Sequence, residues 1–422
     1  MGFIPTEESR RQEIEEFKRM VVACAGLSRR KDEEEQLGFH LRSPEIDDDV
    51  GEEKIVCVTS GVSFLGLAVV NRLLVRGYAV RILVDNQEDV EKLREMEEAA
   101  AGEEGRRRLG SSNNGVVEAV VASLFQVETL AEAFNGCRGV FHTAAFADPA
   151  GLSGYTGAYC IFRTAFTMFS VSDYRFNLNP PTFDACQKSM GEIEVKAAEN
   201  VVEACSRTPS VRSCVLTSSL LACIWRDSTL QDYPCVINHE SWSEETFCRD
   251  KRLWYALGKL RAEKAAWRIA KEKGVKLATI CPGLITGPEF FDRNPTSTVA
   301  YLKGNPNPIS PTTPLISLWI NTIGAQEMFA DGLLATVDVM KLAEAQACVF
   351  EGMKKTAGGR YICYDNVIES EETAEKLAEE VGMSAERICG NRGAYIPAPF
   401  QLSNRKLSNL MSRTLRSCYN QR

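Results

Sequence analysis

The sequence predicts an α/β fold, with a Rossmann-type doubly wound parallel sheet and a smaller C-terminal part that binds substrate. The first observation is that short β-type runs alternate with amphipathic helical segments between residues 54 and 281. The second is a Gly/Ser turn that directly follows the first of these runs. The third is a Tyr-x-x-x-Lys pair downstream of a strand that ends in hydroxyl side chains.

The individual elements follow from hydrophobic periodicity and from run length. Short apolar runs predict buried strands at 55–58, 79–84, 116–121, 139–142, 213–217 and 277–281. Helical spacing of apolar residues predicts helices at 64–76, 130–134, 192–205 and 255–273. Strands separated by helices favour a parallel sheet with helices on both faces, so we expect a Rossmann domain over 54–281.

The remaining chain is less regular. Residues 1–53 carry blocks of charge and are expected to form a partly disordered N-terminal extension, with a short amphipathic helix within 6–26. After Pro282 the alternation fades, which predicts a substrate-binding part over 282–415. Two apolar stretches, 157–187 and 305–323, have neither a clean period nor caps.

Composition excludes several classes of function. The 422 residues have a formal net charge of −8, which argues against a nucleic-acid or anionic-membrane surface. The 15 cysteines form no Cys-x-x-Cys pair, and there are only 3 histidines, so no metal site is expected. No signal core or membrane span is evident, which favours a cytoplasmic protein, and the scattered single cysteines favour free buried thiols. The expected partner is a small-molecule substrate.

The turn after the first strand is a candidate dinucleotide site. Backbone amides of such a turn, with the N-terminus of the next helix, can hold a pyrophosphate. Asp85 stands at the end of the second strand, where an acidic side chain commonly binds the adenosine ribose 2′-hydroxyl. The alternative is an ordinary βαβ turn with a strand-capping Asp85. The candidate residues in the turn are Thr59, Gly61, Ser63, Phe64, Leu65 and Gly66.

A second constellation indicates proton-transfer chemistry. Tyr255 and Lys259 are four residues apart, which places both side chains on one face of a helix. A lysine ammonium stabilises a phenolate, so it makes the tyrosine a usable general acid near neutral pH. Ser219 follows a β-type run and can donate a hydrogen bond to a substrate carbonyl.

These motifs, in this order, resemble the plant dihydroflavonol reductase and cinnamoyl-CoA reductase group of extended short-chain dehydrogenases/reductases. The segments that carry the resemblance span about residues 54–350 and lie at 139–144, 195–205, 215–219, 240–248, 254–267 and 281–288. The resemblance implies hydride transfer from a nicotinamide to a carbonyl or acyl-CoA thioester of phenylpropanoid or flavonoid type. Tyr255 would be the proton donor, Lys259 would hold the cofactor ribose, and Ser219 would orient the carbonyl. The further cofactor-binding positions that it implies are Ser123, Leu124, Thr143, Ala144 and Pro282.

The sequence also departs from the pattern of that group. Ser60 and Ser63 stand where the group has glycines, and Asp85 stands where NADP-using members have an arginine, so the cofactor is expected to be NADP or NAD. Against that group, 157–187 and 305–323 look like insertions, either lineage-specific loops or translated introns. Two other functions stay open: a catalytically weak dinucleotide-binding protein with a regulatory or defence role, and a nucleotide-sugar epimerase or dehydratase.

Overall fold

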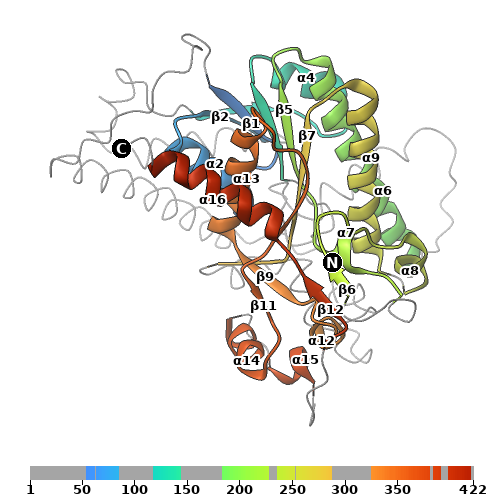
Figure 1. The fold of residues 1–422 in the computed structure, drawn as a ribbon. Helices are drawn as coiled ribbons and strands as arrows, with labels where there is room; N and C mark the ends of the chain where they lie inside the picture. Colours follow the sequence, from blue (N-terminus) through green and yellow to red (C-terminus); the bar gives the residue numbers. More distant parts are fainter. Residues whose placement is uncertain are drawn as a thin grey trace, which may run out of the picture.

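A seven-stranded parallel sheet lies at the centre of the computed structural model (Figure 1). The residues that the structure describes are 54–61, 63–84, 117–143, 183–227, 235–251, 253–287, 325–380, 384–390 and 398–419. The strand order is β10-β7-β5-β4-β1-β2-β3. The bounds are β1 Ile55–Val58, β2 Ala79–Val84, β3 Val117–Val121, β4 Gly139–His142, β5 Ser213–Thr217, β7 Leu277–Pro282 and β10 Gly359–Cys363.

Helices cover both faces of this sheet (Figure 1). One face packs against α2, α13 and α16, and the other against α4, α6 and α9. The bounds are α2 Phe64–Val75, α4 Val127–Phe134, α6 Phe183–Arg207, α9 Trp254–Lys273, α13 Val339–Gly352 and α16 Arg405–Tyr419. The predicted doubly wound α/β fold is therefore confirmed.

Local sequence explains where these elements begin and end. The central strands β5 and β7 are buried along their whole length, as expected of strands that are covered on both faces. Helix α9 ends at Gly274, whose φ of 72° is the left-handed conformation that glycine adopts at low cost. Helix α13 begins after Asp338, whose side chain accepts hydrogen bonds from the Met340 and Lys341 amides.

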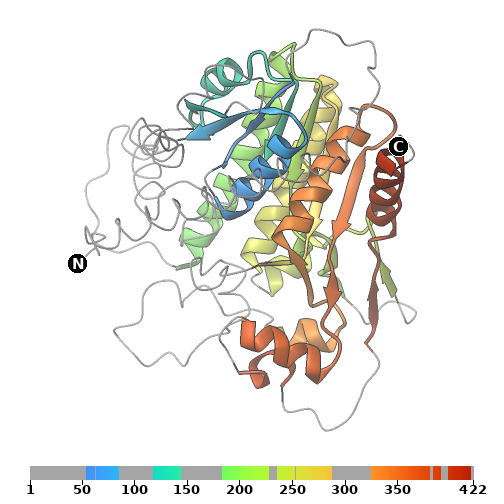
Figure 2. The same ribbon diagram turned by 90° about the vertical axis from the view of Figure 1, so that its left-hand side faces the viewer.

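The smaller part of the fold lies below one end of the sheet in Figure 1, and Figure 2 shows it from the side. It contains a three-stranded sheet, β11-β9-β8, and a two-stranded sheet, β12-β6, around an apolar cluster of its own. The strands are β6 Cys235–Ile237, β8 Leu284–Thr286, β9 Ala335–Asp338, β11 Asn366–Val367 and β12 Phe400–Leu402. The helices are α7 Leu221–Ile224, α8 Glu245–Asp250, α12 Ala325–Ala330, α14 Glu371–Glu380 and α15 Glu386–Cys389.

The predicted division of the chain near residue 281 is too simple. Strand β10, from the C-terminal part, completes the main sheet beside β7, and α13 and α16 cover that sheet. In the other direction, β6 pairs with β12 in the smaller part. The pairing of β10 with β7 is a long-range contact, which local periodicity in the sequence does not encode.

Several sequence expectations fall outside the described residues. These are the N-terminal extension 1–53, the cofactor positions Asp85 and Ala144, and the stretch 305–323. Of the stretch 157–187, only 183–187 is described, and it forms the start of α6. None of the helices that the structure describes combines the length and apolar character needed to span a bilayer. Within the same residues, no cluster of three or more acidic, His or Cys side chains could hold a metal ion.

Candidate active site

The carboxyl ends of β1 and β4 mark the point where the strand order reverses. From β1 the sheet continues through β2 and β3 on one side, and from β4 through β5 and β7 on the other. Open α/β sheets bind their ligands at this switch point. Two hydroxyls here, those of Ser60 and Thr143, are buried and have no hydrogen-bond partner among the described residues. Since buried hydroxyls normally have partners, they are suited to a polar ligand such as a dinucleotide.

The turn between β1 and α2 has the close approach that a dinucleotide turn requires. A Cβ on Gly66 would lie 1.8 Å from the Ser60 carbonyl oxygen, so only glycine fits this position. Ser63 is the N-cap of α2: its hydroxyl accepts from the Gly66 amide at 3.0 Å and donates to the Ser60 carbonyl at 2.7 Å. The turn therefore lets the backbone approach a dinucleotide closely. However, the Gly66 amide, which could otherwise bind a phosphate at the N-terminus of α2, already donates its hydrogen bond to Ser63.

Thr59 and His142 join the ends of β1 and β4. The Thr59 hydroxyl lies 3.0 Å from Nδ1 of His142, and both side chains are buried. Burial, together with the positive charge of Lys259, lowers the pKa of His142 to about 3. His142 is therefore neutral at the switch point. No sequence motif includes His142 as a functional residue, although its place at the end of β4 is a signal that could have found it.

Helix α9 brings Tyr255 and Lys259 onto one face. The Lys259 Nζ lies 5.9 Å from the centre of the Tyr255 ring, which is half-buried. Lys259 is only 3% exposed, and its Nζ lies 2.5 Å from Oε1 of Glu194 on α6. Burial alone would lower the pKa of Lys259, but the negative charge of Glu194, with a smaller effect of Tyr255, raises it. Lys259 is therefore an ammonium. Nothing in the sequence pointed to Glu194, because its role depends on how α6 packs on α9.

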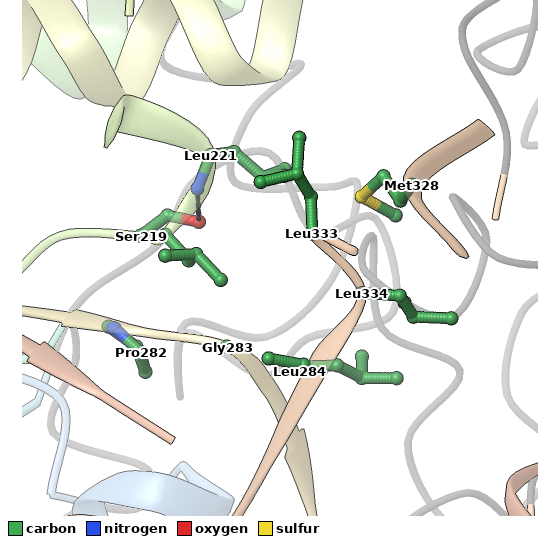
Figure 3. Close-up of a pocket in the computed structure, with 10 residues that line it drawn as sticks. Ser219, Leu221, Pro282, Gly283, Leu284, Met328, Leu333 and Leu334 are labelled. Carbon is green, nitrogen blue, oxygen red and sulfur yellow. Dashed lines mark hydrogen bonds between the residues drawn. The ribbon is translucent and has the colours of Figure 1, made fainter. Parts of the chain in front are cut away.

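Ser219 lies just beyond β5 and faces a small pocket (Figure 3). Its hydroxyl accepts a hydrogen bond from the Leu221 amide at 3.2 Å, which leaves its proton free to be donated. Pro282, at the end of β7, lines the same pocket, as Figure 3 shows. The other lining residues are apolar: Leu220, Leu221, Gly283, Leu284, Met328, Leu333, Leu334 and Ala335. Tyr255 packs against the apolar cluster of the smaller part, to which Leu220, Leu221 and Leu334 of this lining also belong.

The neighbouring hydroxyl, Ser218, serves a different purpose. It donates to the buried carboxylate of Glu263 at 2.7 Å, and this carboxylate also accepts from Thr279. Ser218 is therefore committed to a buried network inside the fold. Ser219 is the hydroxyl of this pair that lines the pocket.

The side chains of some other predicted cofactor positions are engaged within the fold. Leu124 is 1% exposed and packs in the core beside Phe134, so only its backbone is available to an adenine. The Ser123 hydroxyl accepts from the Phe125 amide at 3.3 Å in the turn before α4. Leu65 lies in the core that α2 forms with the sheet, and Phe64 packs against it.

Comparison with known proteins gives the fold and the site their context. No family model matches the chain. Cinnamoyl-CoA reductase 1 of Petunia hybrida is 30% identical over 362 residues, which cover 85% of this chain and 86% of the reductase. Tetraketide α-pyrone reductase 1 of Arabidopsis thaliana is 28% identical over 327 residues, which cover 76% and 80%. The crystal structure of a yeast methylglyoxal/isovaleraldehyde reductase complexed with NADPH has a TM-score of 0.52 at 18% identity, and the match covers 87% of this chain and 97% of that one.

The fold is that of the extended short-chain dehydrogenases/reductases, a class that the strand order, the turn after β1 and the Tyr255/Lys259 helix define together. Within that class, the chain belongs to the plant cinnamoyl-CoA reductase and dihydroflavonol reductase-like group. The resemblance that the sequence motifs indicated is thereby confirmed.

Proposed function

We propose that this protein is an NAD(P)-dependent reductase that acts on a carbonyl or acyl-CoA thioester attached to a flat apolar group, of phenylpropanoid or flavonoid type. The observation that carries the proposal is a buried lysine ammonium one helical turn from Tyr255, whose ring packs on the apolar cluster that also lines the Ser219 pocket. Such an ammonium favours the phenolate of Tyr255, which makes the phenol an effective proton donor.

The chain's own residues would perform the proton transfer and hold the substrate. The nicotinamide, when bound, supplies the hydride to the carbonyl carbon. The Ser219 hydroxyl donates a hydrogen bond to the carbonyl oxygen, where negative charge develops. The Tyr255 hydroxyl then gives its proton to that oxygen, and Lys259 stabilises the phenolate that remains. Pro282 limits the space beside Ser219, so it would help to align the two reacting carbons.

The cofactor is proposed to be NADP or NAD, held between the turn after β1 and the end of β4. Its support is the close approach at Gly66 and the two unpartnered hydroxyls of Ser60 and Thr143. The precedent of the yeast reductase complexed with NADPH favours NADP, whereas Asp85 favours NAD.

The apolar lining of the Ser219 pocket supports the substrate class. Leucine and methionine side chains surround the only hydroxyl that lines the pocket within the described residues, which suits an apolar group next to a single carbonyl. The names of two relatives, a cinnamoyl-CoA reductase and a tetraketide α-pyrone reductase, fit a substrate of this kind.

A second candidate is a dinucleotide-binding protein with little catalytic activity and a regulatory role. The observation that favours it is that the Ser63 hydroxyl takes the Gly66 amide at the N-terminus of α2. A cofactor phosphate would have to displace this cap or bind without that amide. Weak binding of the cofactor would then limit turnover even with Tyr255 and Lys259 in place.

The test combines cofactor binding with a substrate panel. NADPH and NADH affinities are measured by calorimetry, and turnover is measured with hydroxycinnamoyl-CoA esters, hydroxycinnamaldehydes and dihydroflavonols. For Tyr255→Phe we expect turnover to fall by about 10² to 10⁴ with nearly unchanged cofactor affinity, because only the acidic proton is lost. Cofactor binding without turnover on any of the three classes would favour the second candidate.

A further inference from the structure

Lys259 and Glu194 form an ion pair inside the interface between α9 and α6. The Nζ and Oε1 atoms are 2.5 Å apart, and the side chains are 4% and 8% exposed. A charge pair this deeply buried differs from the other pairs between these helices. Arg268, for example, pairs with Glu199 across the same interface with its side chain 57% exposed.

The charges around Lys259 come from three elements. Glu194 reaches it from α6, and Tyr255 and Glu263 lie on α9 itself. His142, on β4, is close enough for the lysine charge to act on it, but His142 is neutral. Glu194 is the strongest of the stabilising groups, and the carboxylate of Glu263 is already engaged by Arg360.

A lysine that is removed from water loses its proton readily unless a counter-charge holds it. In the proposed mechanism only the ammonium form of Lys259 is useful, since a neutral amine would not favour the phenolate of Tyr255. The proposed reductase chemistry therefore depends on the carboxylate of Glu194, which is the counter-charge of Lys259.

We propose that Glu194 is a positioning residue of the active site, which keeps Lys259 charged and fixes the direction of its ammonium beside Tyr255. An ammonium has three protons to donate. Glu194 accepts one of them and so orients the other two. This inference rests on the proposed reductase function, because it assigns the use of that ammonium to proton transfer.

The test uses Glu194→Gln, which keeps the size and hydrogen-bonding capacity of the side chain and removes its charge. Glu194→Asp keeps the charge but withdraws it by one methylene. Glu199→Gln is the matched control, because it removes a carboxylate from an exposed pair between the same two helices. The full-length protein is labelled with ¹³C at lysine Cε, and the pH at which Lys259 loses its proton is followed by NMR without cofactor. The Lys259 signal is assigned by its loss in Lys259→Met.

For Glu194→Gln we expect the pH midpoint of Lys259 to fall by at least about 2 units, within the range seen for buried lysines that lack a counter-charge. Glu194→Asp is expected to give a smaller fall in the same direction, and Glu199→Gln none. If Glu194→Gln does not fold, Glu194→Asp carries the test. A Lys259 midpoint that stays at the wild-type value in whichever of these variants folds would overturn the inference.

Turnover gives a second readout. Since an uncharged Lys259 loses its function above its own midpoint, the ratio of Glu194→Gln to wild-type turnover should fall with rising pH, by about 10-fold for each pH unit above the lowered midpoint. A ratio that is low but independent of pH would indicate a merely structural role for Glu194 and overturn the proposal. A shifted Lys259 midpoint in a protein whose wild type reduces nothing would contradict the proposed function instead, and would leave Glu194 as the counter-ion of Lys259.

Discussion

Arg360 and Glu263 form an ion pair that is closed to solvent on both sides. The Arg360 Nε lies 2.7 Å from Oε1 of Glu263, and the two side chains are 6% and 0% exposed. Arg360 also stacks on the Trp242 ring, with its guanidinium carbon 3.5 Å from the ring centre, and donates to the carbonyl oxygen of Ser241. The pair thus joins β10 and α9 to the loop before α8, and Glu263 also accepts a hydrogen bond from Ser218, the residue that follows β5.

Removal of one partner should destabilise the fold strongly. Arg360→Met leaves the Glu263 carboxylate buried without its main counter-charge, so we expect the free energy of unfolding to fall by about 3 to 5 kcal/mol. Arg360→Met combined with Glu263→Leu should cost less than the two single changes together, because no buried charge remains. Urea unfolding measures all of these values.

The control is Lys376→Met, which removes an ion pair with Glu372 on the surface of α14. Exposed pairs contribute little, so no measurable change is expected there. If Arg360→Met proved as harmless as Lys376→Met, the buried pair would not be a structural link between the two parts of the fold.

The serine cap of α2 predicts a change in cofactor affinity. In Ser63→Gly the Gly66 amide is released and the Cβ is removed, so we expect NADPH to bind several-fold more tightly, with a loss of only a few tenths of a kcal/mol in stability. Ser63→Ala also releases the amide but keeps the Cβ, and it should cost about 1 kcal/mol. Calorimetry measures the NADPH affinity of each variant.

The comparison of these two variants identifies the obstacle. A gain in NADPH affinity in Ser63→Gly alone would mean that the Cβ hinders binding of the pyrophosphate. Equal gains in affinity in both variants would mean that the Ser63 hydroxyl competes with the pyrophosphate for the Gly66 amide. Unchanged affinity in both variants would refute the idea that Ser63 weakens this site.

Much of the fold could be predicted because its strands are short, apolar and separated by clear helices. The strands at 55–58, 79–84, 139–142 and 213–217 have the predicted bounds. The position of β10 in the main sheet could not be predicted, because β8, α12, β9 and α13 separate this strand from β7 in the sequence. Its membership in the sheet comes from long-range pairing, which local periodicity does not encode.

The site was predictable where a motif is local and not where it depends on packing. Tyr255 and Lys259 share a helix face by their spacing, and Ser219 follows from its place after a strand. Glu194 acts through Lys259, which is distant in the sequence, so residue spacing gives no indication of its role. His142 could have been found from its place at the end of β4, although its contact with Thr59 depends on strand pairing.

Asp85 predicts the choice between the two nicotinamide cofactors. A carboxylate near the adenosine ribose disfavours a 2′-phosphate by charge repulsion, so we expect weaker NADPH binding than in relatives with an arginine there. Asp85→Arg should shift the ratio of NADPH to NADH affinity towards NADPH by about 10-fold or more, measured by calorimetry with both cofactors. Tighter binding of NADPH than NADH by the wild type, unchanged in this variant, would place Asp85 away from the ribose.

His142 predicts how stability changes with pH. Its pKa in the folded protein is about 3, below the value of about 6.5 for an unperturbed histidine. Between these values the unfolded chain binds a proton that the folded protein does not, so the stabilising effect of a neutral His142 is present above pH 6.5 and is lost as the pH falls. From pH 7 to pH 5 the contribution of His142 to the free energy of unfolding should therefore fall by about 2 kcal/mol. The asparagine side chain of His142→Asn can still hydrogen-bond to Thr59. In this variant the fall in the free energy of unfolding from pH 7 to pH 5 should be smaller by about 2 kcal/mol, as measured by urea unfolding at pH 7 and pH 5. His239→Asn is the matched control. Burial lowers the pKa of His239 too, but His239 is less buried than His142, so the pH dependence should change less. An identical pH dependence in wild type and His142→Asn would show that His142 takes up its proton without cost to the fold, and that the switch point is more open to water than its burial implies.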